Sequence, residues 1–338
     1  MKKTFGVLPS GEQASLYTIS CGSITAAVTD YGAHLVSLLV PDKAGNVADV
    51  VLGYDDANGY RDGTCFFGAT VGRSANRIGG SSFLLNGKEV NLTPNENANN
   101  LHSGPHFYHN RMWQVVFHSA NAIVLRLNSP DGDQGFPGNA VIEVTYELDE
   151  MGGLHIRYDA DCDQDTVFNL TNHSYFNLAG HEKTEQCMDQ KLTISAEYFT
   201  PDDAQNIPTG ELRAVEGTPF DFRAPKPIGR DIGEDYDQLK LQGGYDHNFV
   251  VYSNPCAILE APDGGRTMMV FTDCPGVQFY AGNFITDQVG KDGVQYGKRT
   301  GVCLETQYYP DSVHHDEWPQ PITKAGEHYH SETVYSFI

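Results

Sequence analysis

The sequence of 338 residues contains no apolar run that approaches the length of about 18 residues that a membrane-spanning helix needs. Its N-terminal segment, residues 1–20, carries Lys2 and Lys3 but no continuous apolar stretch behind them, as a secretory signal would require. We therefore expect a cytoplasmic protein that has no membrane partner.

Positive charge is also scarce, because 22 lysines and arginines stand against 44 aspartates and glutamates. The formal net charge of −22 repels nucleic acid and anionic surfaces, so we expect no nucleic-acid partner. The seven cysteines include no C-x-x-C pair, and their odd number favours reduced thiols that pack in the core over a disulfide framework.

Several motifs of common enzymes are missing. The sequence has no GxGxxG after a strand, no GxxxxGK[ST] and no GxSxG, which excludes the usual dinucleotide, P-loop and nucleophile-elbow sites. We therefore predict no cofactor. The pairs His314–His315 and His328-x-His330 lack further ligands at a recognised spacing, so we interpret them as surface histidines and predict no metal site.

Short alternating or β-branched runs recur along the whole chain, separated by Gly, Pro, Asn or Asp, which is typical of strands. Apolar residues almost never repeat with the period of a helix, so helices should be few and short. Asn86-Gly87 predicts a two-residue hairpin turn. The pattern predicts one all-β domain over residues 1–338, built from antiparallel sheets as a sandwich or barrel.

Residues 168–178 alternate between apolar and polar side chains, as a half-buried strand does. We predict one strand here, with Phe168 and Leu170 on its apolar face and His173 and Tyr175 on its polar face. A histidine in this position is either a working acid or base, or a member of a satisfied hydrogen-bond ladder.

Residues 301–311, GVCLETQYYPD, place Cys303, Glu305 and Gln307 on one face of a predicted strand and Leu304 and Thr306 on the other. A carboxylate in such an apolar run is partly buried, and its burial is costly unless the group is paired or used. This favours a functional Glu305.

Three other segments carry polar residues in strand-like or loop-like surroundings. GRSANRI at 72–78 holds Arg73, which we expect to be solvated or in a salt bridge, and NENANNLHSG at 95–104 ends in a loop histidine, His102. Asp246 precedes an apolar strand, where a turn residue that bonds its own backbone is the simplest interpretation.

Residues 276–284, GVQFYAGNF, add Gln278, Tyr280 and Phe284 on one face. Neutral donors, acceptors and an aromatic ring suit polyols better than phosphates. The residues alone therefore indicate general acid–base chemistry on a carbohydrate, or plain carbohydrate binding.

Long motifs between residues 70 and 312 then resemble the aldose 1-epimerase (galactose mutarotase) family. They are, in order, GRSANRI, NNLHSG, DQGFPGN, LTNHSYFNL, FTPDDAQNIPTGE, FDF, YDHNFV, PGVQFYAGNF and LETQYYPDS. The resemblance implies a large antiparallel β-sandwich with a sugar cleft on one sheet. It also implies a cofactor-free enzyme that interconverts the α and β anomers of free aldoses such as galactose and glucose.

In the family's scheme, a glutamate takes the proton of the C1 hydroxyl and a histidine protonates the ring oxygen. Carried onto this sequence, the general base is Glu305 and the general acid is His173, with His102 as a second imidazole near the sugar. The residues that resemble those gripping the sugar hydroxyls are Asn76, Arg77, Asp246 and Gln278. For Asp246 the resemblance favours function over the turn interpretation.

The roles agree with the chemistry, because ring opening removes a proton at O1 and delivers one at O5, two atoms on one carbon. A base and an acid must therefore face each other across a narrow gap. The sequence departs from the commonest family pattern at Tyr308, where histidine is frequent, and at Val313, where proline is frequent. We expect these two residues beside the cleft, at its rim.

Three alternatives remain open. A glycoside hydrolase could use Asp246 and Glu305 as its two carboxylates. A hexose-6-phosphate epimerase should show an added basic pocket, and the acidic sequence offers no clear one. A non-catalytic sugar-binding protein on the same fold would not need both Glu305 and His173. We expect a monomer or a weak homodimer.

Overall fold

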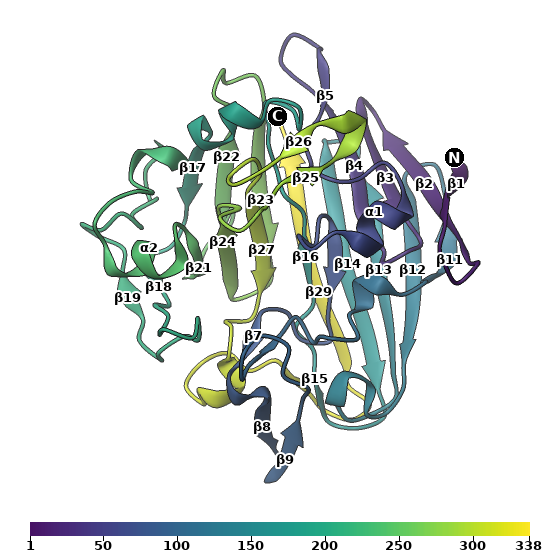
Figure 1. Cartoon of the computed structure of the whole chain (residues 1–338), viewed down its shortest axis with the longest axis vertical. Coiled ribbons are helices and arrows are strands. Elements are labelled where there is room, and N and C mark those ends of the chain that lie inside the picture. Colours follow the sequence, from purple (N-terminus) through teal and green to yellow (C-terminus); the bar gives the residue numbers. More distant parts are fainter.

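The computed structural model describes residues 1–338, and its strands form two layers. The first layer is one antiparallel sheet of nine strands, whose members from β11 to β29 run side by side in Figure 1. In spatial order its strands are β11 (Gln114–His118), β12 (Ala122–Ser129), β13 (Ala140–Leu148), β14 (Gly153–Cys162), β29 (His328–Phe337), β23 (Thr267–Thr272), β22 (Ala257–Glu260), β17 (Lys191–Ile194) and β20 (Lys226–Pro227).

The second layer consists of two five-stranded sheets with a short pair of strands between them. One sheet is β1 (Lys2–Val7), β2 (Gln13–Cys21), β3 (Ile24–Thr29), β4 (Leu35–Pro41) and β5 (Val47–Asp49). The other is β19 (Arg213–Ala214), β18 (Tyr198–Phe199), β21 (Asp246–Val250), β24 (Gly276–Tyr280) and β27 (Cys303–Gln307). The pair between them is β6 (Ala69–Val71) and β16 (Thr171–His173).

Hydrogen bonds join the short pair to both sheets. The Leu35 amide of β4 donates to the carbonyl of Gly68, which precedes β6, at 2.9 Å, and the Thr171 hydroxyl of β16 donates to the Thr306 carbonyl of β27 at 2.9 Å. The second layer is therefore continuous from β1 to β19, and β16 lies directly beside β27.

Short ladders and helices complete the chain. The ladders are β7 (Arg77–Ile78) with β10 (Asn100–Leu101), β8 (Ser82–Leu85) with β9 (Lys88–Asn91), β15 (Thr166–Val167) with β28 (Ile322–Thr323), and β25 (Gln288–Val289) with β26 (Gln295–Tyr296). The α-helices are α1 (Ala57–Asp62) and α2 (Asp237–Gln242). The 3-10 turns are η1 (Gly79–Ser81), η2 (Tyr108–Asn110), η3 (Asp133–Gly135), η4 (Thr184–Asp189), η5 (Ile228–Arg230), η6 (Lys291–Gly293) and η7 (Ser312–His314). None of these helices is long and apolar enough to span a membrane.

The main hydrophobic core lies between the two layers and draws on residues from Tyr17 to Phe337. Strand β27 shows how the layers meet, because the Tyr335 hydroxyl of β29 donates to the Leu304 carbonyl at 3.0 Å and the hydroxyls of Thr306 and Thr333 bond to each other. The inner face of β27 thus packs on the nine-stranded sheet, and Glu305 points to the opposite side. The all-β antiparallel sandwich is confirmed.

The hairpin predicted at Asn86-Gly87 is also confirmed. Both residues have positive φ, 53° and 74°, and they join β8 to β9. This conformation matches a two-residue turn between right-handed, twisted strands.

The single strand predicted over residues 168–178 is wrong. Only Thr171–His173 forms a strand, while Asn169 bridges to Ser74, and Phe176 bridges to Val51 and Val302. Both faces of the segment are buried, because its polar side chains find partners inside the protein. The Asn169 side chain, for example, accepts from the Tyr308 amide at 2.8 Å. Periodicity alone cannot show that a polar face is satisfied by protein instead of water.

The prediction that the cysteines mostly pack in the core is confirmed. All are unpaired, and all except the half-buried Cys21 are buried.

Candidate active site

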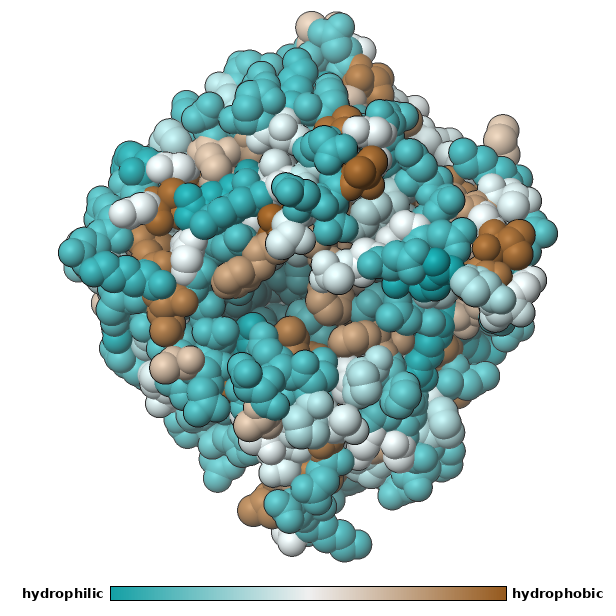
Figure 2. Space-filling view, in the orientation of Figure 1, coloured by the Kyte–Doolittle hydropathy of each residue, from teal (hydrophilic) through white to brown (hydrophobic).

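A cavity of about 360 Å³ opens on the outer face of the second layer. Figure 2 shows a hollow near the middle of this face, with hydrophobic side chains on its walls among hydrophilic ones. Its volume lies in the range of small-molecule sites. The cavity is lined by Thr64, Cys65, Phe66, Asn76, Arg77, Glu96, Leu101, His102, His173, Tyr175, Asn206, Asp246, Tyr280, Phe284, Ile285 and Glu305.

Glu305 reaches the cavity from the middle of β27 and is only 2% exposed. Its Oε1 lies 3.7 Å from Nε2 of His173, and its Oε2 has no hydrogen-bond partner in the protein. Burial, and then the nearby negative charge of Asp246, raise the pKa of Glu305 well above that of an exposed glutamate. The side chain is therefore poised to take up a proton and has an oxygen free for a ligand hydroxyl.

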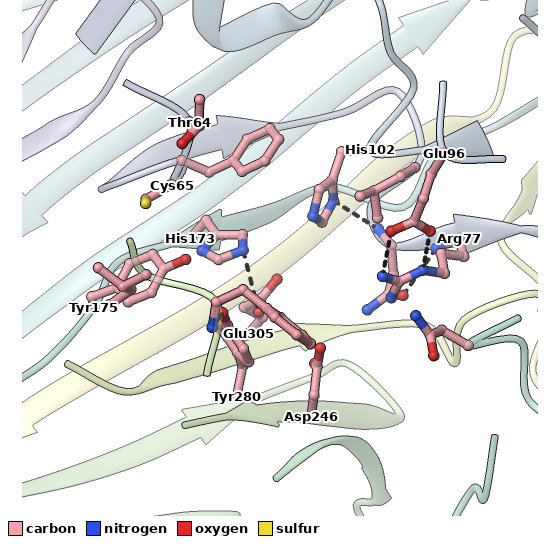
Figure 3. Close-up of a pocket in the computed structure, with 16 residues that line it drawn as sticks. Thr64, Cys65, Arg77, Glu96, His102, His173, Tyr175, Asp246, Tyr280 and Glu305 are labelled. Carbon is pink, nitrogen blue, oxygen red and sulfur yellow. Dashed lines mark hydrogen bonds and ion pairs between the residues drawn. The ribbon is translucent and has the colours of Figure 1, made fainter. Parts of the chain in front are cut away.

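His173 ends β16, whose pairing places it opposite Ala69 of β6. Its ring is stacked on Tyr175 at 5.0 Å and on Phe66 at 5.7 Å, and its Nδ1 lies 3.5 Å from the Cys303 sulfur. Burial lowers the pKa of His173 to about 4, so its cationic form gives up a proton readily. Figure 3 shows His173 and Glu305 pointing toward each other, joined by a dashed line.

Burial raises the pKa of Glu305 and lowers the pKa of His173, which favours a neutral acid beside a neutral imidazole. A neutral acid beside a neutral imidazole and a carboxylate beside an imidazolium differ only in where one proton lies. Such a pair can accept a proton on one side and release one on the other.

His102 lies edge-on to His173, with ring centroids 5.5 Å apart. Its Nδ1 accepts from the Asn76 amide at 3.0 Å, so the neutral ring carries its proton on Nε2. Burial lowers the pKa of His102 well below its ordinary value, which keeps the ring neutral. The Nε2–H of His102 can therefore donate a hydrogen bond into the cavity. The structure thus places this loop histidine in the site.

Arg77 is held by Glu96 on the cavity wall, as Figure 3 shows. Nε and Nη2 of Arg77 donate to the two carboxylate oxygens of Glu96 at 2.5 and 2.8 Å. The neighbouring Asn76 side chain accepts from the Arg77 amide at 2.9 Å, which fixes its orientation. The guanidinium is therefore fixed in place and largely neutralised by Glu96.

Asp246 also lines the cavity, from the first residue of β21. Burial raises the pKa of its carboxyl group. Gln278 lies opposite Glu305 in the β24–β27 ladder, does not line the cavity, and donates to Asp246 at 2.8 Å. Six of the seven residues named from the sequence thus line one cavity, and the seventh, Gln278, positions a neighbour.

The remaining cavity residues were not assigned to the site from the sequence. Tyr175 lies two residues after His173 and could have been found by its position; Tyr280 and Phe284 were noted only as part of a polar and aromatic strand face. Phe66, Glu96 and Asn206 come from separate loops, and no local pattern shows that these loops converge. They include the ring that covers His173 and the carboxylate that neutralises Arg77.

The expectation that Arg73 is solvated or in a salt bridge is wrong. Its side chain is fully buried and forms no ion pair. It donates to the Pro137 carbonyl and the Ser129 hydroxyl, each at 2.7 Å, and to the Thr166 hydroxyl at 3.1 Å. Neutral oxygens from separate segments satisfy the guanidinium, and Arg73 thereby ties these segments together.

Tyr308 and Val313 were expected at the cleft rim, and this expectation is also wrong. Neither lines the cavity, because Tyr308 packs against the main core and Val313 against a smaller cluster around Phe83 and Phe136.

The histidine pairs lie outside the cavity. His328 and His330 are exposed and both bond to Asp159, while His314 bonds to Asp311 and His315 is partly buried. The one group of side chains with ligand atoms close enough to share a metal ion is His173, Cys303 and Glu305, within 4.8 Å of one another.

The model of the aldose 1-epimerase family matches residues 15–336 of this sequence. The chain belongs to the aldose 1-epimerase family. It is 39% identical to galactose mutarotase of Bos taurus over 342 residues, which cover 99% of this chain and 98% of that relative. It is 36% identical to aldose 1-epimerase of Escherichia coli (strain K12) over 346 residues, which cover 100% and 99%.

Solved structures of family members have the same fold. An aldose epimerase homologue from C. elegans superimposes with a TM-score of 0.89 at 32% identity and covers 96% of this chain and 99% of its own. A galactose 1-epimerase from Lactobacillus acidophilus gives a TM-score of 0.88 at 27% identity, with 100% and 98% covered. The aldose 1-epimerase fold thus extends over the whole of this chain.

Proposed function

We propose that this chain is an aldose 1-epimerase that interconverts the α and β anomers of free aldohexoses such as galactose and glucose. The observation that carries the proposal is the buried pair of Glu305 and His173, 3.7 Å apart, in a cavity of monosaccharide size. Membership of a family of isomerases supports the same reaction.

In the ion-pair form, the Glu305 carboxylate takes the proton of the sugar's O1 hydroxyl while Nε2 of His173 protonates the ring oxygen O5. The C1–O5 bond breaks, and the open-chain aldehyde forms. Rotation about C1–C2 presents the other face of the carbonyl to the C5 hydroxyl. In closure the two side chains exchange roles, because the reaction is the reverse of opening. No covalent intermediate and no cofactor are needed.

The rest of the cavity binds the sugar in this proposal. The Nε2–H of His102 donates to a sugar oxygen near the reacting centre, and Asn76, Arg77 and Asp246 bond the more distant hydroxyls. Gln278 holds Asp246 in place. The rings of Phe66 and Tyr175 keep water from the faces of His173, which strengthens each polar interaction inside.

The charge of the cavity favours a neutral sugar over a hexose phosphate. The cavity is lined by three carboxyl groups, those of Glu96, Asp246 and Glu305. Its one guanidinium, that of Arg77, already donates two hydrogen bonds to Glu96. No group is left to compensate a phosphate dianion. No observation favours a glycoside hydrolase.

Polarimetry of freshly dissolved α-D-galactose and α-D-glucose tests the function. We expect the protein to accelerate the approach to equilibrium, and Glu305→Gln to lower kcat by a factor of about 10² to 10⁴. Glu143→Gln is the matched control, because Glu143 pairs with Arg126 outside the cavity. Its kcat should equal that of the unchanged protein.

Two results would overturn the proposal. One is a rate equal to that of buffer with both sugars, which together with measurable sugar binding would identify a sugar-binding protein. The other is full activity of Glu305→Gln, which would remove the assigned base.

A further inference from the structure

The aromatic contacts of His173 do not determine which of its two ring nitrogens faces the reacting sugar. Tyr175 and Phe66 lie nearly parallel to the imidazole, at interplanar angles of 27° and 24°, and His102 and Tyr280 meet it edge-on. Such contacts fix the plane of a ring but do not distinguish Nδ1 from Nε2. The orientation must therefore come from polar contacts.

His173 has two polar side chains at its ring nitrogens, and both come from β27. Glu305 faces Nε2 at 3.7 Å, and the sulfur of Cys303 lies 3.5 Å from Nδ1. Cys303 and Glu305 are two residues apart on the same face of the strand, and Cys303 is fully buried opposite Tyr280 in the ladder with β24. One strand thus presents the catalytic carboxylate and, at a fixed spacing, a thiol to the other edge of the imidazole.

We propose that Cys303 is a positioning residue for His173: its sulfur accepts a hydrogen bond from Nδ1–H and so reserves Nε2 as the nitrogen that gains and loses the catalytic proton. This inference rests on the function proposed above. It assigns a role to a residue that is outside the cavity lining and does not touch the sugar.

The direction of the bond follows from the proton cycle of His173. In the imidazolium both nitrogens carry hydrogen, so Nδ1 can only donate to Cys303. If the thiol donated to a bare Nδ1 in the neutral ring, donor and acceptor would have to exchange each time the ring became an imidazolium. A constant Nδ1–H to sulfur bond lets the ring keep one orientation while Nε2 cycles.

A thiol beside Nδ1 is also compatible with the role of His173 as a general acid. A carboxylate at Nδ1 would stabilise the imidazolium and raise the pKa of His173. Burial raises the pKa of Cys303 well above its ordinary value, so the thiol stays neutral and is only a weak acceptor. It orients the ring without making His173 a poorer proton donor.

The tautomer can be measured without sugar and without turnover. In protein labelled with ¹⁵N-histidine, at neutral pH, we expect the His173 resonances of a neutral ring protonated on Nδ1. Cys303→Ala should give a mixture of tautomers or the form protonated on Nε2, and Cys303→Ser should restore the original form, because the serine oxygen also accepts. A wild-type ring protonated on Nε2, with bare Nδ1, would overturn the inference.

Kinetics supply a second readout. Cys303→Ala should lower kcat on the order of 10-fold with little change in KM, and Cys303→Ser should recover most of the loss. The matched control is Cys256→Ala, which removes an equally buried thiol elsewhere in the core. Equal kcat for Cys303→Ala and the control, with an unchanged tautomer, would contradict a positioning role.

The two proposals fail separately. Absence of mutarotation in the unchanged protein would reject the function but leave the tautomer measurement intact. If Cys303→Ala does not fold, the wild-type tautomer and the Cys303→Ser variant still decide the question.

Discussion

At the scale of single residues, Arg73 shows how much of this fold depends on buried polar groups. Its guanidinium reaches oxygens on three separate segments, at Ser129, Pro137 and Thr166, and it has no carboxylate partner. The five N–H donors of a planar guanidinium can reach all of these oxygens at once, whereas the ammonium group of a lysine cannot.

We predict that Arg73→Lys lowers the free energy of unfolding by about 3 kcal/mol, the value of one or two hydrogen bonds to a charged group. Urea unfolding followed by circular dichroism measures this. Arg126→Lys is the control, since Arg126 is partly exposed and pairs with Glu143, and it should change stability by less than about 1 kcal/mol. Equal losses in both variants would show that Arg73 is not a structural tie.

The sequence predicts some residues well and others poorly for a physical reason. Glu305 could be found because a carboxylate between apolar neighbours is costly unless it is used. Arg73 could not, because its acceptors are carbonyls and hydroxyls far away along the chain. Glu96 was missed for a similar reason, since its partner Arg77 lies 19 residues away in strand β7.

At the scale of elements, β27 was predictable and the segment around His173 was not. The alternation of Leu304, Glu305 and Thr306 correctly separates the core face from the cavity face. Residues 168–178 alternate equally well, yet only three of them form a strand, because long-range bridges to Ser74, Val51 and Val302 interrupt it. The alternation of apolar and polar residues thus predicts which face of a strand each side chain occupies. Pairing with distant segments determines where the strand ends.

His247 of β21 makes a pH-dependent contact with helix α2, and its side chain does not line the cavity. His247 accepts from the Asp246 amide at 3.2 Å on Nδ1, and its Nε2 bonds to Gln238 of α2 at 3.1 Å. Burial lowers the pKa of His247 to about 3. Between about pH 6.5 and 3 the unfolded chain binds a proton on this ring that the folded protein does not, so stability falls as pH falls through this window.

We predict that His247→Asn makes the decline in unfolding free energy shallower by about 1.4 kcal/mol per pH unit near pH 5, the slope of one proton. Denaturant titrations at several pH values measure this slope. A loss of unfolding free energy that is the same at every pH does not affect it. In the control His328→Gln the slope should not change there, because Asp161 and Asp159 raise the pKa of His328 and its contribution is lost only above its ordinary pKa. An unchanged slope in His247→Asn would mean that the ring is protonated in the fold.

At the scale of the whole molecule, strands of the second layer and the loops beside them assemble a site that no single segment contains. Glu305 comes from β27, His173 from β16, His102 from the loop after β10, and Asp246 from β21. The chain carries a net charge of −22, and acidic residues outnumber basic ones in the lining of the cavity. The acidic composition offered no clear basic pocket for a phosphate, and the cavity agrees, because Glu96 neutralises its only guanidinium.

This electrostatic arrangement predicts discrimination between D-galactose and D-galacturonate, which differ in charge at C6. We expect kcat/KM to be lower for the uronate, and the difference to shrink as salt screens the carboxylates. Glu96→Gln leaves the Arg77 guanidinium without its counter-charge. It should therefore raise the ratio of kcat/KM for galacturonate over galactose by about 10-fold, which corresponds to about 1.4 kcal/mol.

Glu143→Gln separates this local effect from net charge, because it removes the same charge from a partly exposed ion pair outside the cavity. Its selectivity ratio should stay close to that of the unchanged protein. An equal rise in both variants would assign the discrimination to the field of the whole molecule. A rise in neither would mean that the shape of the cavity, and not the Arg77–Glu96 pair, excludes the uronate. Only a rise confined to Glu96→Gln supports Glu96 as the residue that reserves this cavity for neutral sugars.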